Sequence, residues 1–221
     1  MSINLLSQIN KDFAALILLT SFGLLVQRRV YDLLFLFAWQ GLFLSISTAI
    51  VGFASGAHHL YIASIMTLAL KVILIPYILY ILIHRLQIYK EVEDLTNIPL
   101  IMLIGIALVI FSYHVTAPIR ELSTLLTRYT IAIALATVML GLLMMITRRH
   151  AVTQIIGFLA MENGLFFAAT STTYGMPLVV ELGVALDILI AAFIFGIFFF
   201  QIRNTFDSLD IEQMTKLKEE D

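Results

Sequence analysis

The sequence has very little charge. Only 13% of its 221 residues are Asp, Glu, Lys or Arg, and 61% are hydrophobic. A soluble domain has about 25% charged residues. So few charged side chains could not cover the surface of a globular domain that buried this much apolar material. The composition therefore indicates an integral membrane protein, and the mean hydropathy of +0.99 agrees.

Cysteine is absent altogether. Disulfide bonds, thiolate metal sites and iron–sulfur clusters held by this chain are therefore excluded. The formal net charge of −2 argues against nucleic acid as a partner. A cleavable signal peptide is not expected, because the first ten residues carry no positive side chain. The sequence shows no nucleophile triad, phosphate loop or dinucleotide fingerprint, so we assign it no catalytic residue, metal or cofactor.

Seven apolar runs are long enough to cross a bilayer, whose core, about 30 Å thick, needs roughly 20 residues per helix. They are 12–27, 30–54, 58–84, 97–114, 122–147, 150–173 and 176–202. Backbone groups in lipid must be satisfied within their own segment, so each run is expected to be a helix. The predicted fold class is all-α, with about seven transmembrane helices and a polar cytoplasmic tail at 203–221.

The distribution of Lys and Arg predicts the orientation. Cytoplasmic loops carry an excess of these residues. With the N-terminus outside, two of them fall outside (Lys11 and Arg120) and nine fall inside (Arg28, Arg29, Arg85, Lys90, Arg148, Arg149, Arg203, Lys216 and Lys218). We therefore predict an outer N-terminus and an inner C-terminus.

The first three and the last three spans resemble one another. GLLVQRR (23–29) matches GLLMMITRR (141–149), AWQGLF (38–43) matches MENGLF (161–166), and LALKVILIPYI (68–78) matches VALDILIAAFI (184–194). Fixed-distance similarity of this kind predicts an internal repeat. The predicted units are parallel three-helix repeats at 1–96 and 122–202, joined by an extra helix at 97–121. A chance likeness between apolar helices is the alternative.

Ionisable side chains within the spans are the candidate functional residues, because a charge near the bilayer centre is costly and usually functional. Lys71, Glu162 and Asp187 lie near the middle of their spans. Asn163 adjoins Glu162, and Glu181 lies about one helical turn inside the last span. Burial disfavours the charged form of such groups, so we predict that they form a proton pathway. The alternative is a permanent ion pair of Lys71 with Glu162 or Asp187 that orders the two halves.

Other notable residues are given structural roles. The histidines occupy turns and span ends without metal-ligand spacing (His58, His59, His84, His114 and His150). Pro76 is predicted to kink the third span one turn beyond Lys71. Three glycines are expected to allow close helix packing (Gly157, Gly164 and Gly183).

Several segments resemble a known family. MENG (161–164), VELGVALD (180–187), LKVILIPYI (70–78) and the tail DSLDIEQMTKLK (207–218) are similar to component E of the hydrogenase-4 group of membrane complexes. The second half also resembles the three-span proton-channel subunit of respiratory complex I and the matching subunit of multisubunit cation/proton antiporters.

This resemblance implies a non-catalytic inner-membrane subunit of a multisubunit oxidoreductase, such as a formate hydrogenlyase-like complex. Its partners would be antiporter-like membrane subunits and a peripheral electron-transfer arm. Those partners would hold the iron–sulfur clusters and, in true hydrogenases, a nickel–iron centre. An antiporter subunit or an autonomous secondary transporter is the alternative.

The resemblance also bears on the candidate residues. In the three-span relatives, an acid in the second span and another in the third form the intramembrane proton path. Asp187 matches the third-span acid. Glu162 lies one helical turn beyond the usual glutamate position, which Leu159 occupies.

Overall fold

The computed structural model describes residues 3–85, 97–118 and 130–173, and, within the last predicted span, Leu189, Phe193 and Gly196. All regular elements of this described part are helices. They are α1 (Ile3–Val26), α2 (Val30–Ser55), α3 (His58–Thr67), η1 (Leu68–Leu74), α4 (Ile75–Arg85), α5 (Ile98–Val115), α7 (Thr130–Thr147) and α8 (Ala151–Thr173). The segment η1 is π-helical and joins α3 to α4, so these three elements form one continuous span.

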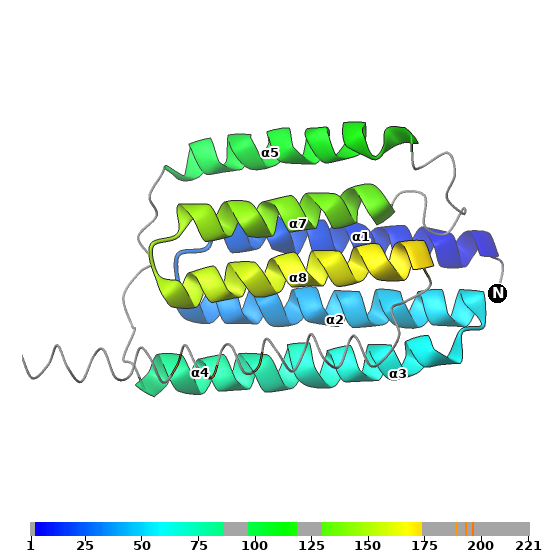
Figure 1. The fold of residues 1–221 in the computed structure, drawn as a ribbon, viewed down its shortest axis with the longest axis horizontal. Helices are drawn as coiled ribbons and strands as arrows, with labels where there is room; N and C mark the ends of the chain where they lie inside the picture. Colours follow the sequence, from blue (N-terminus) through cyan, green and yellow to red (C-terminus); the bar gives the residue numbers. More distant parts are fainter. Residues whose placement is uncertain are drawn as a thin grey trace, which may run out of the picture.

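The spans lie side by side as an up-and-down bundle (Figure 1). Helices α1 and α2 form one antiparallel hairpin, and α7 and α8 form another. The two hairpins face each other, with α1 against α7 and α2 against α8. Helix α5 packs against α7 and α1 on one side of the bundle, while α3, η1 and α4 pack against α2 on the other side.

Six helices of the described part are long and apolar enough to cross a membrane. They confirm the first six predicted spans, and most of their ends agree to within one residue. The seventh predicted span, 176–202, lies outside the described residues apart from the three single positions. Large apolar side chains on the outer surface are exposed, among them Leu103, Ile65 and Ile146. Such a surface suits lipid, and the structure is that of a multi-pass membrane protein.

The first helix begins earlier than the sequence predicted, at Ile3 instead of residue 12. Asn10 lies in this added part and is fully buried. Its Oδ1 accepts a hydrogen bond of 2.6 Å from Ser47 Oγ on α2. Packing against a polar partner on α2 therefore allows the helix to include residues that an apolar-run criterion leaves out.

Helices α7 and α8 pack almost backbone to backbone. A Cβ at Gly141 would lie 2.6 Å from the backbone nitrogen of Met161, and one at Gly164 would lie 2.8 Å from that of Val138. Gly157 is also tightly enclosed, by Met145. The predicted packing role of Gly157 and Gly164 is confirmed. Gly141 has the same role, which the sequence did not predict. Gly183 lies outside the described residues.

The irregularity of the third span lies before Pro76 and around Lys71. The sequence predicted a kink at the proline. Proline has no N–H and cannot make the α-helical bond to the carbonyl four residues earlier. The structure accommodates this with the π-helical η1, where the Ile75 N–H donates to the carbonyl oxygen of Leu70. Short π segments occur frequently at functional sites.

Candidate functional site

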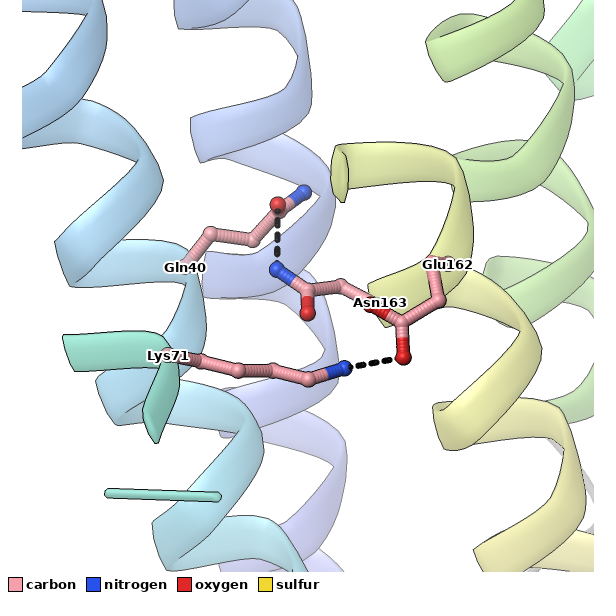
Figure 2. A network of polar contacts seen from close by, with 4 residues as sticks. All are labelled: Gln40, Lys71, Glu162 and Asn163. Carbon is pink, nitrogen blue, oxygen red and sulfur yellow. Dashed lines mark hydrogen bonds and ion pairs between the residues drawn. The ribbon is translucent and has the colours of Figure 1, made fainter. Parts of the chain in front are cut away.

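A buried ion pair joins the third span to α8. Lys71 Nζ, on η1, donates a hydrogen bond of 2.7 Å to Glu162 Oε1. The two side chains are only 5% and 11% exposed. Figure 2 shows them reaching toward each other from facing helices. Among the described residues, the structure thus pairs Lys71 with Glu162, one of the two acids that the sequence left open.

Two neighbours position the lysine. Gly41 on α2 lies directly behind it, and a Cβ at this position would come within 3.3 Å of Lys71 Cβ. The missing side chain lets η1 approach α2 closely. On the other side, Lys71 Nζ lies 5.3 Å from the centroid of the Phe166 ring. A cation at this distance is attracted to the face of the ring, so the ammonium contacts both a carboxylate and an aromatic side chain of α8.

A chain of buried hydrogen bonds runs beside the ion pair. Asn163 Nδ2 donates to Gln40 Oε1 over 3.0 Å, and Gln40 Nε2 donates to Ser21 Oγ over 2.9 Å. Ser21 Oγ in turn donates to the carbonyl oxygen of Ile17 over 2.8 Å. The side chains of Ser21, Gln40 and Asn163 are buried. This chain links α8 through α2 to α1, and Figure 2 shows its Gln40–Asn163 bond next to the ion pair.

Two acceptor atoms of the site have no partner among the residues that the structure describes. They are Glu162 Oε2 and Asn163 Oδ1, and both are buried. An unpaired buried acceptor costs its full desolvation penalty. These neighbouring residues of α8 therefore present oxygen atoms to the interior without a donor from the described chain.

The predicted site residues have different outcomes. Lys71, Glu162 and Asn163 come together, whereas Asp187 and Glu181 lie outside the described residues. The sequence did not single out Ser21 or Gln40. The available signal for Gln40 was its match to Asn163 in the repeat comparison. Ser21 carried no signal, because a hydroxyl in an apolar helix usually bonds to its own backbone.

Arg148 is a second buried charge, at a position that the sequence predicts to be a turn. It is 1% exposed, and its Nη2 donates to the carbonyl oxygens of Leu24, Leu25 and Gln27 at 3.1, 2.9 and 2.7 Å. These carbonyls lie at the C-terminal end of α1, where a cation is favourable. Arg28, in the corresponding turn of the first hairpin, is exposed. The repeated Arg-Arg pairs therefore do not reveal which arginine is buried.

The fold and site define a multi-pass helical membrane protein with a hydrogen-bonded ion pair buried between spans. No family model matches the chain, and no solved structure matches it. It is 32% identical over 210 residues to the uncharacterized protein Rv0085 of Mycobacterium tuberculosis, which covers 94% of this chain and 96% of that relative.

It is also 26% identical over 212 residues to hydrogenase-4 component E of Escherichia coli, and equally so to the protein of that name in Shigella flexneri. These matches cover 96% of this chain and 98% of each relative. The chain therefore belongs to the family that contains Rv0085 and hydrogenase-4 component E, as the resemblance of MENG and VELGVALD predicted.

Proposed function

We propose that this chain is a non-catalytic membrane subunit of a hydrogenase-4-like complex, in which buried ionisable residues contribute to proton translocation. The similarity to hydrogenase-4 component E spans almost the whole of both chains, which supports a shared architecture. The name of that relative describes it as one component of a hydrogenase. The six membrane-length helices support a role within the membrane part of such an assembly.

The observation that carries the proposal is the Lys71–Glu162 pair. Glu162 is residue 12 of the 23 residues of α8, and Lys71 lies near the middle of its own span. A buried ion pair is often no more stabilising than apolar side chains of similar volume, because desolvation opposes the Coulombic attraction. Stability alone therefore gives little reason to keep these charges at mid-span, and function is the better explanation.

The geometry suits a proton step. Transfer of one proton from Lys71 Nζ to Glu162 Oε1, over the 2.7 Å bond, would convert an ammonium and a carboxylate into a neutral amine and a neutral carboxyl group. The two groups would then no longer attract each other as ions, and each could exchange a proton with a different side of the membrane. Asn163, Asp187 and Glu181 are proposed to extend this pathway.

The proposed partners are antiporter-like membrane subunits and a peripheral arm in which electron transfer drives the translocation. That arm would hold the iron–sulfur clusters and, in a true hydrogenase, a nickel–iron centre. The proposed location is the inner cell membrane. This chain would supply membrane-embedded proton carriers and no redox group.

The first test is the variant Glu162→Gln in the assembled complex. The amide keeps an acceptor for Lys71 and a similar size but cannot carry the proton. We expect assembly to be retained and proton translocation per electron to be lost, as measured by proton uptake into inverted membrane vesicles. The matched control is Thr170→Val, which removes a buried hydroxyl that bonds to the carbonyl of Phe167 on the same helix. Normal pumping in Glu162→Gln would refute the proposal.

Purification from the native membrane separates the remaining alternatives. Copurification with antiporter-like subunits and an iron–sulfur protein supports the proposal. Copurification with antiporter subunits alone indicates a multisubunit cation/proton antiporter. A lone chain that transports in liposomes indicates an autonomous transporter. A complex that pumps normally with Lys71→Ala and Asp187→Asn would instead assign the chain a structural role.

A further inference from the structure

Glu162 and Asn163 each leave one oxygen unpaired inside the bundle. Glu162 Oε2 and Asn163 Oδ1 are buried and have no hydrogen-bond donor within the described parts of the chain. Asn163 is fully buried, and Glu162 is buried as well. In Figure 2 the side-chain oxygen of Asn163, Oδ1, points away from Gln40, to the side on which the Lys71–Glu162 pair lies. Consecutive residues of a helix project in different directions, but the side chains of Glu162 and Asn163 both turn toward Lys71 (Figure 2), so one ligand between them could donate to both oxygens.

The hydrogen-bond chain determines which atom Asn163 presents. The Ser21 hydroxyl proton is committed to the carbonyl oxygen of Ile17, so Ser21 Oγ must accept from Gln40. Gln40 then offers its oxygen to Asn163, and Asn163 must direct its NH2 group toward Gln40. A flipped amide would lose this bond. Asn163 is therefore held with its oxygen facing the ion pair, and the bound group must be a donor.

The charge of the site restricts the ligand further. Lys71 donates to Glu162 Oε1, which pairs an ammonium with a carboxylate. An ionised carboxylate accepts on both oxygens and donates from neither. An anion is disfavoured by two acceptor oxygens, and a metal cation by the adjacent ammonium. A neutral donor fits both conditions.

We propose that Glu162 Oε2 and Asn163 Oδ1 bind one internal water molecule. The water would donate one hydrogen bond to each oxygen and accept a third from Lys71 Nζ, which has three N–H donors and uses one on Glu162 Oε1. Buried waters typically make about three hydrogen bonds to otherwise unsatisfied polar groups. This water would connect the ion pair to the Asn163–Gln40–Ser21 chain, so that one hydrogen-bonded network extends from η1 across α8 and α2 to α1.

The test is a structure of the full chain in its native membrane complex, at a resolution that shows ordered water. We expect one solvent peak within hydrogen-bond distance of both oxygens. In Asn163→Leu, which removes the second acceptor, the peak should be lost. In Thr170→Val, about two helical turns away, it should persist. Absence of the peak from the wild-type site, or a donor side chain from a partner subunit in its place, would overturn the proposal.

A second variant keeps the test decisive if Asn163→Leu does not assemble. In Glu162→Gln an NH2 donor replaces the acceptor Glu162 Oε2, so the water can no longer donate to both residues, and we expect its peak to be lost. Infrared spectra provide an independent measurement. A buried O–H stretching band should shift in H2(18)O for the wild type and be absent in Glu162→Gln, and an unchanged band in this variant would contradict the site. Neither measurement depends on proton pumping. The water site can therefore be confirmed or rejected even if the proposed function proves wrong.

Discussion

At the scale of single residues, the interior is organised around charges that make several contacts each. Lys71 contacts the Glu162 carboxylate and the Phe166 ring. Arg148 bonds to three carbonyl oxygens at the end of α1. A charged side chain in a membrane interior is tolerated when it pairs with an opposite charge or with backbone carbonyls. Both patterns are present, and only the carboxylate–lysine pair can readily exchange a proton.

A pair of substitutions separates a structural from a functional role of the ion pair. Lys71→Met alone leaves an unpaired buried carboxylate, which costs about 3–5 kcal/mol in comparable cases. We expect the thermal stability of the purified protein to fall. In the double variant Lys71→Met/Glu162→Leu both charges are gone, and stability should recover. Proton translocation should be absent from both variants.

The measurements are unfolding midpoints in detergent or nanodiscs and proton uptake in vesicles. Recovery of stability together with recovery of pumping would contradict the proton pathway. A double variant no more stable than Lys71→Met would show that the pair is needed for folding itself.

At the scale of helices, glycines that allow two helices to approach closely determine where the polar groups meet. Gly41 allows η1 to lie against α2, and Gly141 and Gly164 allow α7 to lie against α8. The π-helical geometry of η1 affects the face that Lys71 presents, because a π turn contains an additional residue relative to an α turn. The ion pair therefore depends on helix packing as well as on the identity of its two residues.

Gly41→Ala tests this dependence. Its Cβ would lie 3.3 Å from Lys71 Cβ and 3.5 Å from the backbone carbon of Lys71, so η1 must move by a few tenths of an ångström. We expect reduced proton translocation with assembly retained. In the control Gly23→Ala, the nearest atoms belong to the flexible end of the Leu36 side chain, and translocation should stay close to wild type. Equal effects in both variants would contradict the argument.

Arg148 provides an element-scale prediction about stability. Arg148→Met removes the donor to two carbonyls of α1 and to that of Gln27 directly after it, and a hydrogen bond to a charged group contributes about 1.5–3 kcal/mol. We expect a clear loss of thermal stability, measured as the unfolding midpoint. Arg28→Met, at an exposed position of the corresponding turn, should change stability by no more than about 0.5 kcal/mol. An unfolding midpoint that Arg148→Met leaves unchanged would show that these hydrogen bonds contribute little to stability.

At the scale of the whole molecule, the two hairpins meet through corresponding positions. Asn163 and Gln40 are 123 positions apart and share a hydrogen bond, and Gly164 and Gly41 have the same separation. Helix α1 also faces α7, as α2 faces α8. This arrangement is what a parallel repeat with similar halves would produce, although the repeat and its boundaries stay a prediction. The turns after α1 and α7 touch at one end of the bundle.

The absence of cysteine offers a direct test of orientation. Single cysteines can be introduced at exposed positions, since the chain has none of its own. With the N-terminus outside, we expect a membrane-impermeant maleimide to label His58→Cys, at the start of α3, in intact cells. Arg28→Cys, in the turn after α1, should be labelled only after the cells are permeabilised. The reverse pattern would show that the positive-inside argument fails here.

The sequence by itself determined the class of the protein and the approximate positions of the six spans that the structure describes. The chain has few charges and long apolar runs. In lipid, the backbone groups of such a run must be hydrogen-bonded within it, which favours membrane-spanning helices. It also identified Lys71 and Glu162, because ionisable groups stand out among apolar residues. It did not show that Gln40 and Ser21 hold Asn163, or that Arg148 is buried over the end of α1. Those contacts join residues 19 to 124 positions apart, and only the packing of the helices brings such distant polar groups within hydrogen-bond distance.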